Sequence, residues 1–182
     1  MRIASRTVPP LAAALMLGAV VAGCGSRSST TTQGSPTVQW ADGLCAAMTS
    51  YKSSLGDIGT SLKSTVPSKS TLEEAAKDTK SATQTLVASL QGLGKPGTAA
   101  GDQAKQTLDG LASDLRNDAS TIEGAGGADT GVVEAASVVS TTLVTAKNQV
   151  QTAVDDLRQL EPKAELQQAF AQAPSCSSLS VG

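Results

Sequence analysis

Apolar residues between positions 44 and 160 recur at steps that alternate between four and three. This heptad spacing aligns one stripe of side chains along a helix that packs against other helices. Nowhere do apolar and polar residues alternate over a sustained stretch, so the pattern predicts helices and no sheet. Four stripes follow one another along the chain: Leu44, Met48, Tyr51, Leu55, Ile58, Leu62 and Val66; Leu72, Ala76, Thr79, Thr83, Leu86, Leu90 and Leu93; Ala104, Leu108, Leu111, Leu115, Ala119 and Ile122; and Val132, Ala136, Val139, Leu143, Ala146, Val150, Val154, Leu157 and Leu160.

Capping signals stand at the start of the first two predicted helices. Ser35 followed by Pro36, or else Thr37, can begin the first helix, because a hydroxyl caps free backbone N–H groups and proline fits the first turn. Pro67 ends this helix. The segment Ser70 to Glu73 has the residues of a capping box, so we expect the second helix to open there.

Glycine and proline mark the remaining boundaries. The segment Gly92 to Gly97 breaks the second helix, and the segment Gly124 to Gly127 stops the third. Pro162 terminates the fourth helix and fits the first turn of a short fifth helix, which ends before Pro174. Four long helices joined by short turns favour an all-α, up-down-up-down four-helix bundle with a short C-terminal fifth helix.

Two cysteines support this topology independently. Cys45 lies near the start of the first predicted helix, and Cys176 lies shortly after the fourth. An even number of long helices brings both to the same end of the bundle, whereas an odd number leaves them roughly 40 Å apart. Residues 1–23 have the pattern of a secretion signal, and two thiols in an exported protein most simply form one disulfide, so we predict a Cys45–Cys176 bridge. The alternative is two free thiols.

The first 23 residues have the three parts of a secretion signal. Arg2 and Arg6 form a positive n-region, and an apolar run from Leu11 to Ala22 follows. This run is short for a membrane span, which needs about 20 apolar residues. It ends in the sequence VAGC, which resembles a bacterial lipobox with Cys24 as the acceptor of acyl chains such as palmitate. The alternative is an ordinary signal peptide with a chance cysteine. We predict removal of residues 1–23 and a lipid anchor on Cys24 that holds the chain on the outer face of the cell membrane.

Ser, Thr and Gly dominate the segment that follows the lipobox cysteine. Such a composition is typical of a flexible tether, and twelve residues of it reach roughly 20 Å. We therefore divide the chain into a signal peptide (1–23), a lipidated cysteine with its tether (24–36), and a helical bundle domain with a C-terminal tail (37–182).

Composition excludes several classes of function. Without the signal peptide, 12 of the 14 basic residues remain beside 16 acidic ones, and the chain has one Trp, one Tyr and one Phe. Nucleic-acid binding needs a basic face and stacking aromatics, so we expect no nucleic-acid partner. The chain has no histidine, which removes the usual ligands of zinc, copper and haem and the usual catalytic base. We predict no metal, no cofactor and no catalytic residues.

Carboxylates are the remaining candidates for acid-base chemistry. Asp114 and Asp118 share a helix face, while the adjacent pairs Glu73-Glu74 and Asp155-Asp156 point about 100° apart on their helices. We expect solvated carboxylates. The nearest exception is Asp118, which lies beside the third apolar stripe, and a raised pKa there would reopen the question of an enzyme.

Three residues of the first helix have two interpretations each. Gly56 and Gly59 either form a hinge or a groove for another helix or acyl chain, or mark a tolerated kink or close packing; we favour the second. Trp40 either caps the open end of the core or lies against lipid headgroups, and we favour the cap.

The segments WADGLCAA (Trp40 to Ala47), LQGLGKPGT (Leu90 to Thr98) and GDQAK (Gly101 to Lys105), with the late pair Ser175-Cys176, resemble the small secreted helical lipoproteins of actinobacteria. The resemblance covers nearly the whole chain after the signal peptide. It implies a helical fold, a disulfide and a membrane location, and it carries over no functional site.

The sequence leaves two hypotheses for the function of the chain. The first is a non-enzymatic binding or structural lipoprotein that presents helical faces to an envelope or secreted protein. The alternative is a carrier or sensor of a small apolar ligand held between the helices. A cavity lined by Leu and Val favours the carrier, and a tightly filled core favours the binding module.

Overall fold

A computed structural model of the chain describes residues 34–64, 66–127, 131–160 and 163–179. These residues form five α-helices and a 3₁₀ helix, and no strand occurs among them. The predicted signal peptide, the predicted acylation site Cys24 and most of the predicted tether lie outside the described residues. The elements are α1 (Pro36–Ser64), α2 (Lys69–Leu93), α3 (Gly101–Gly127), α4 (Val132–Gln159), α5 (Lys163–Gln172) and the 3₁₀ helix η1 (Pro174–Leu179).

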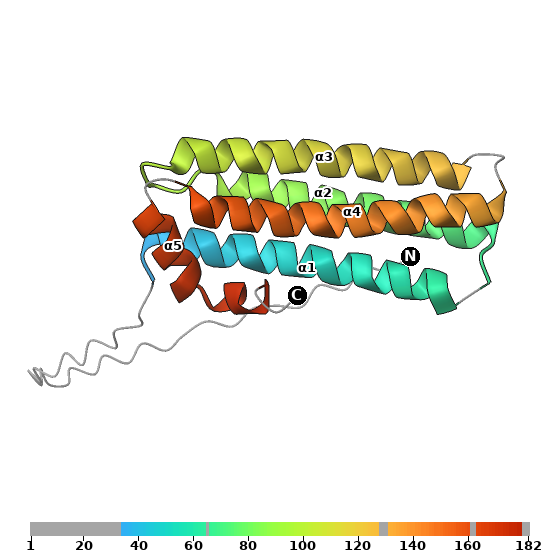
Figure 1. Cartoon of the computed structure of the whole chain (residues 1–182), viewed down its shortest axis with the longest axis horizontal. Helices are drawn as coiled ribbons and strands as arrows, with labels where there is room; N and C mark the ends of the chain where they lie inside the picture. Colours follow the sequence, from blue (N-terminus) through green and yellow to red (C-terminus); the bar gives the residue numbers. More distant parts are fainter. Residues whose placement is uncertain (1–33, 65, 128–130, 161–162, 180–182) are drawn as a thin grey trace, which may run out of the picture. The chain divides into compact units, whose positions relative to one another are not determined.

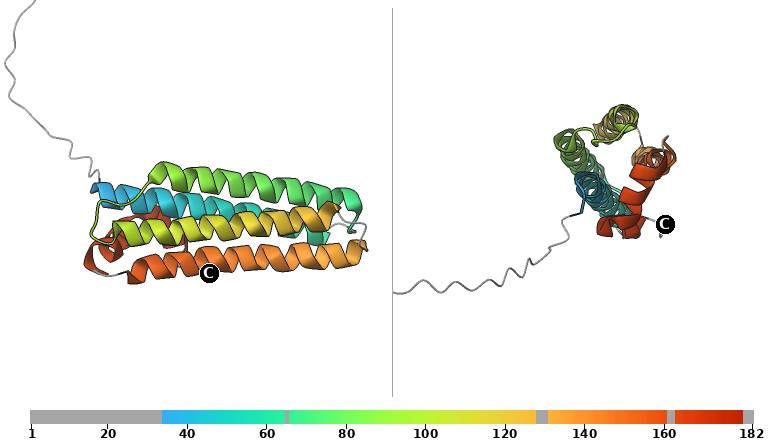
Figure 2. Two further views of the ribbon diagram at one scale, coloured as in Figure 1. Left: turned by 90° about the horizontal axis from the view of Figure 1, so that it is seen from above. Right: turned by 90° about the vertical axis from the view of Figure 1, so that its left-hand side faces the viewer.

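The four long helices form the predicted all-α, up-down-up-down bundle (Figure 1). Each packs against the next along the chain, and α4 returns beside α1. The short helices α5 and η1 pack against α1 at the end where α1 begins and α4 ends (Figure 2). The predicted short fifth helix is therefore confirmed, and η1 was not predicted.

The heptad stripes form the core of the bundle. Nearly every stripe position is buried, including the polar Thr79 and Thr83 of α2. Val66 is the clear error, since its side chain is 89% exposed. The helix ends at Ser64, two residues before it, so the heptad pattern continues past the helix that it describes.

The start of α2 differs from the predicted capping box. Ser68 is the N-cap, not Ser70: its hydroxyl accepts a hydrogen bond from Thr71 N at 3.2 Å, and Thr71 Oγ1 accepts one from Ser68 N at 2.9 Å. The helix thus begins two residues earlier than predicted, and the exposed Glu73 takes no part in the cap. At α1 the expected cap forms, since Val38 N donates to Ser35 Oγ at 3.3 Å.

The end of α3 also differs, because the helix continues through the predicted stop to Gly127. Gly126 is buried, and a Cβ placed on it would lie 3.2 Å from the carbonyl oxygen of Leu72. The missing side chain lets the last turn of α3 approach the first turn of α2. This close packing offsets the helix-propensity cost of glycine, about 1 kcal/mol per residue.

Gly56 and Gly59 of α1 are not explained by close packing. A Cβ on Gly59 would meet no atom within 4 Å, and one on Gly56 would meet only the end of Lys147, at 3.6 Å. Of the two possibilities in the interpretation that we favoured, close packing is therefore contradicted, and the other, that the two glycines are tolerated inside the helix, agrees with the structure.

We expect Gly59→Ala to raise the free energy of unfolding by about 0.5–1 kcal/mol, because alanine fits the helix and restricts the unfolded chain. The matched variant Gly126→Ala should lower it by about 1 kcal/mol or more, since the added methyl group presses on a backbone oxygen. Urea denaturation followed by circular dichroism measures both. Equal effects of the same sign would contradict this difference in packing.

The C-terminal segment is bonded to the first turns of α1 by a disulfide and a hydrogen bond. Cys45 and Cys176 form the predicted disulfide, with their Cα atoms 4.9 Å apart. Next to it, Ser175 N donates to Asp42 Oδ1 at 2.8 Å. The even-helix topology therefore brings the two cysteines together as expected.

Trp40 lies at this end of the core and is 6% exposed. Its indole N–H donates to the carbonyl oxygen of Gly94 at 3.1 Å, and its ring meets Phe170 of α5 edge to face, with centroids 6.3 Å apart. Gly94 has a φ of 61°, a conformation that favours glycine and ends α2 there. The structure thus shows Trp40 as the cap that we favoured.

Candidate functional site

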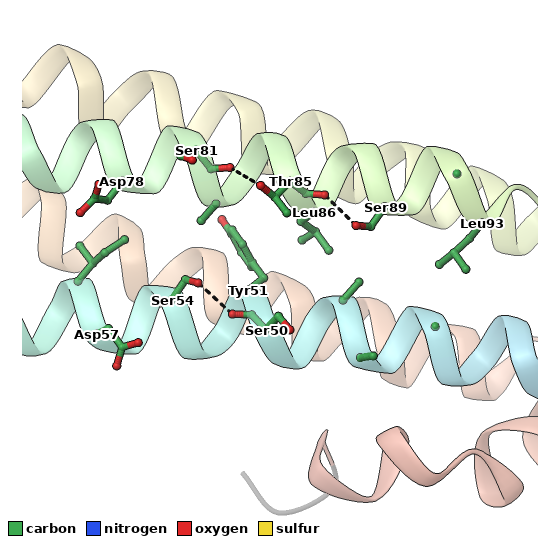
Figure 3. Close-up of a pocket in the computed structure, with 16 residues that line it drawn as sticks. Ser50, Tyr51, Ser54, Asp57, Asp78, Ser81, Thr85, Leu86, Ser89 and Leu93 are labelled. Atoms are coloured by element: carbon green, nitrogen blue, oxygen red, sulfur yellow. Dashed lines mark hydrogen bonds between the residues drawn. The ribbon is translucent and has the colours of Figure 1, made fainter. Parts of the chain in front are cut away.

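An open groove of about 740 Å³ runs between α1 and α2 (Figure 3). It extends along α1 from Gly43 to Ile58 and along α2 from Asp78 to Leu93. The fourteen steps from Gly43 to Asp57 rise about 21 Å, so the groove follows about four turns of each helix. Buried Tyr51 and Leu86 form part of its floor.

Small or short side chains line both walls at heptad spacing. Each wall residue immediately precedes a core residue of its own helix, so the wall stripe runs beside the core stripe. The walls therefore repeat in steps of four and three, like the core. These wall residues are Gly43, Ala47, Ser50, Ser54 and Asp57 on α1, and Asp78, Ala82, Thr85, Ser89 and Gly92 on α2. Ala46 and Ser81 line the groove beside this repeat.

Several wall hydroxyls bond to the backbone of their own helix. Ser54 Oγ donates to Ser50 O at 3.1 Å, Thr85 Oγ1 to Ser81 O at 3.0 Å, and Ser89 Oγ to Thr85 O at 2.9 Å (Figure 3). A serine or threonine in this arrangement turns its donor away from the groove. The walls are accordingly less polar than their composition indicates.

Charge is confined to one end of the groove. Asp57 and Asp78 are the charged residues of the lining, and both are exposed. The ion pairs found in the described part of the chain involve neither of them. The opposite end, where Gly43 faces the side chain of Leu93, carries no charge.

A second polar feature lies inside the bundle. The hydroxyl of Tyr51 in α1 lies 3.2 Å from Thr83 Oγ1 in α2, and Thr79 Oγ1 donates to Ala75 O at 2.8 Å. Burial raises the pKa of Tyr51, an effect that the hydrogen bond with Thr83 opposes and the charge of Asp118 increases.

Asp118 of α3 is the acidic residue whose charge acts on Tyr51. Its Oδ2 atom is buried without a hydrogen-bond partner, as is Oε1 of Gln149 in α4. Burial raises the pKa of Asp118; a hydrogen bond from Gln149 lowers it, and the charge of Asp114 raises it further. Asp118, the exception among the carboxylates considered from the sequence, is therefore a residue whose pKa the fold raises.

We expect Asp118→Asn to stabilise the protein at pH 7 by about 1 kcal/mol, because it replaces a partly buried, incompletely bonded carboxylate by a neutral group. A raised folded-state pKa makes a contribution to stability that is fully present below the ordinary pKa of aspartate and is lost as pH rises through the folded-state pKa. The gain should thus shrink as the pH falls to 4. Thermal unfolding at both pH values measures it, with exposed Asp156→Asn as the control. An equal effect of Asp118→Asn at both pH values would contradict the perturbed titration.

The other carboxylates considered from the sequence lie on the surface. Glu73, Glu74 and Asp156 are exposed, and Asp155 forms an ion pair with Arg158 at 3.6 Å. Asp114 is exposed one turn before Asp118. Within the described residues, no group of three or more His, Cys, Asp or Glu side chains could hold a metal ion.

The sequence reading missed the groove, although a signal for it was present. A small or short residue stands directly before each core residue over half of α1 and half of α2. The repeat of apolar residues does not include Ser, Gly or Asp, so it does not predict the walls of the groove. The same repeat correctly predicts that Tyr51, Thr79 and Thr83 lie on the core stripes and that Asp118 lies beside one.

Comparisons with protein-family models, with curated proteins and with solved structures found no match for this chain. Among the described helices, none is long and apolar enough to cross a membrane.

Proposed function

We propose that this chain is a lipid-anchored binding module of the cell envelope, held on the outer face of the cell membrane through an acylated Cys24. The signal-like first 23 residues, the lipobox and the Ser/Thr-rich tether support this location. The resemblance to small actinobacterial lipoproteins supports the same location. The bundle then presents its helix faces to an envelope or secreted protein partner.

The groove between α1 and α2 is the observation that carries the binding role. It is open, follows four turns of two helices, and has three wall hydroxyls that bond within their own helices, those of Ser54, Thr85 and Ser89. A surface of this kind can lose its water at little cost when a partner covers it.

The groove is a poorer fit to a carrier of small apolar ligands. Such a carrier is expected to hold its ligand in a cavity lined by Leu and Val, whereas this groove is lined mostly by Ser, Ala, Gly and Thr. The core beneath it is filled by fully buried side chains such as Leu44, Met48 and Leu55. We therefore favour the binding module.

We propose no catalytic role for the module. The chain has no histidine to act as a base near neutral pH. Asp118, the acid with a raised pKa, lies between α3 and α4 next to Gln149 rather than in the groove.

Site-specific photo-crosslinking on intact cells tests the binding role. A benzophenone amino acid is placed in the full chain at Thr85 in the groove, at Ser120 on α3 or at Thr141 on α4, all exposed positions. We expect at least one face to give a discrete crosslinked product with an envelope or secreted protein. Three correctly exported variants that give no product would overturn the binding role.

A further inference from the structure

We propose that the groove between α1 and α2 receives an amphipathic helix of the partner protein, with a stripe of small or apolar residues and a basic residue at one end. This inference rests on the proposed function and adds the chemical class of the partner. It follows from the spacing of the walls, the state of their hydroxyls and the position of the charges.

Both walls repeat with the period of a helix seam. The wall residues of α1 and α2 recur in steps of four and three, which is the spacing that accepts the side chains of a third helix between two others. A groove of about 21 Å accommodates roughly four turns of such a helix. A fatty acyl chain has no comparable repeat, so the periodicity favours a helix over a lipid.

The hydrogen bonds of the walls suit an apolar partner face. Ser54, Thr85 and Ser89 donate to carbonyl groups within their own helices, so a partner that covers these three residues leaves their donors paired. Ser50 and Ser81 also line the groove, and their exposed hydroxyls can bond to the partner or to water. Alanine and glycine at the neighbouring wall positions allow a close approach of a third backbone. The partner stripe should therefore consist of small and aliphatic residues.

The two carboxylates set the direction of the partner helix. Asp57 and Asp78 approach the groove from opposite walls at the same end, and neither has an ion pair in the described part of the chain. A lysine or arginine at one end of the partner stripe would lie between them. At the other end the lining is uncharged, so the reverse direction forfeits this attraction.

The test uses the full chain in lipid nanodiscs and three fluorescent probes. The first is an 18-residue helical peptide with Ala and Leu at heptad positions and two lysines at one end; the second has two glutamates there; the third is a fatty acid. Anisotropy titrations measure binding, and empty nanodiscs give the background. We expect the lysine peptide to bind at least tenfold more tightly than the glutamate peptide, and the fatty acid to bind only at background level.

Variants assign the binding to the groove. Ser50→Trp combined with Thr85→Trp fills the groove from two exposed positions and should weaken binding of the lysine peptide at least tenfold. The matched pair Ser120→Trp and Thr141→Trp, on exposed faces of α3 and α4, should leave it unchanged. Asp57→Lys combined with Asp78→Lys should reverse the preference between the two peptides. Circular dichroism confirms that each variant is folded.

Several results would overturn the helix inference: equal binding of the two peptides, the same affinity after the groove is filled, or a fatty acid that competes with the lysine peptide. The crosslinking experiment separates this failure from that of the proposed function. Products from α3 or α4 with none from Thr85 would leave the binding role standing and refute the groove as its site.

Discussion

Replacing Cys24 by alanine should abolish incorporation of radioactive fatty acid into this protein. In the proposed lipobox the sulfur of Cys24 is the atom that accepts the lipid, and no other residue of the lipobox carries a thiol. Without its acyl chains the protein also loses the two-chain anchor that stable membrane attachment requires. Metabolic labelling followed by immunoprecipitation measures the lipid, and fractionation measures membrane association.

Ser26→Ala, two residues further along the tether, is the matched control and should keep the label in full. Retention of label in Cys24→Ala would refute the lipoprotein prediction. Loss of both label and membrane association would establish the anchor independently of any partner.

Replacement of Cys45 and Cys176 by serine should lower the free energy of unfolding by about 4–5 kcal/mol in the chain-entropy model, because the bridge closes a loop of 131 residues. For a domain of this size the loss corresponds to a fall in melting temperature of about 10 °C or more. The helical circular dichroism spectrum should remain, since neither cysteine stands in the heptad stripes that hold the four long helices together.

Ser178→Ala provides a control in the same region, because it removes the 3.1 Å hydrogen bond to Thr49 and leaves the bridge intact. Its melting temperature should differ from that of the wild type by only a few degrees. Two free thiols in protein isolated from the envelope, or an unchanged melting temperature in the double variant, would contradict a stabilising bridge.

The bundle was predictable because its core residues recur in steps of four and three, a spacing that indicates packed helices rather than strands. Leu72, Thr79 and Leu86 could be assigned to one face of one helix from spacing alone, and the structure buries all three. Boundaries were less predictable, since Ser68 and Ser70 both have the side chain of an N-cap. The structure places the cap at Ser68, where the side chains of Ser68 and Thr71 bond reciprocally to each other's backbone N–H groups.

Tertiary packing also overrides local preference at the end of α3. The three glycines between 124 and 127 read as a stop, yet the helix includes them because Gly126 allows contact with the α2 backbone. The partner of Gly126 lies more than 50 residues away, and no local rule of helix propensity contains that information.

The candidate site was harder to predict than the core, because a groove is defined by side chains that are short. Ser50 and Thr85 are ordinary surface residues in the sequence, and only the pairing of α1 with α2 brings them to facing walls. Asp118 was identifiable from its place beside a core stripe. Its hydrogen bond from Gln149 of α4 was not, since that depends on the register between two helices.

The disulfide has a topological consequence for the protein when a protease cuts one of the connections between its helices. Residues 45–176 form a covalently closed ring, and the α1–α2 and α3–α4 connections both lie within it. A single peptide-bond cut in either connection opens the ring and produces two fragments, one with Cys45 and the other with Cys176. The fragments stay joined through sulfur, so a nicked molecule remains one molecule until it is reduced.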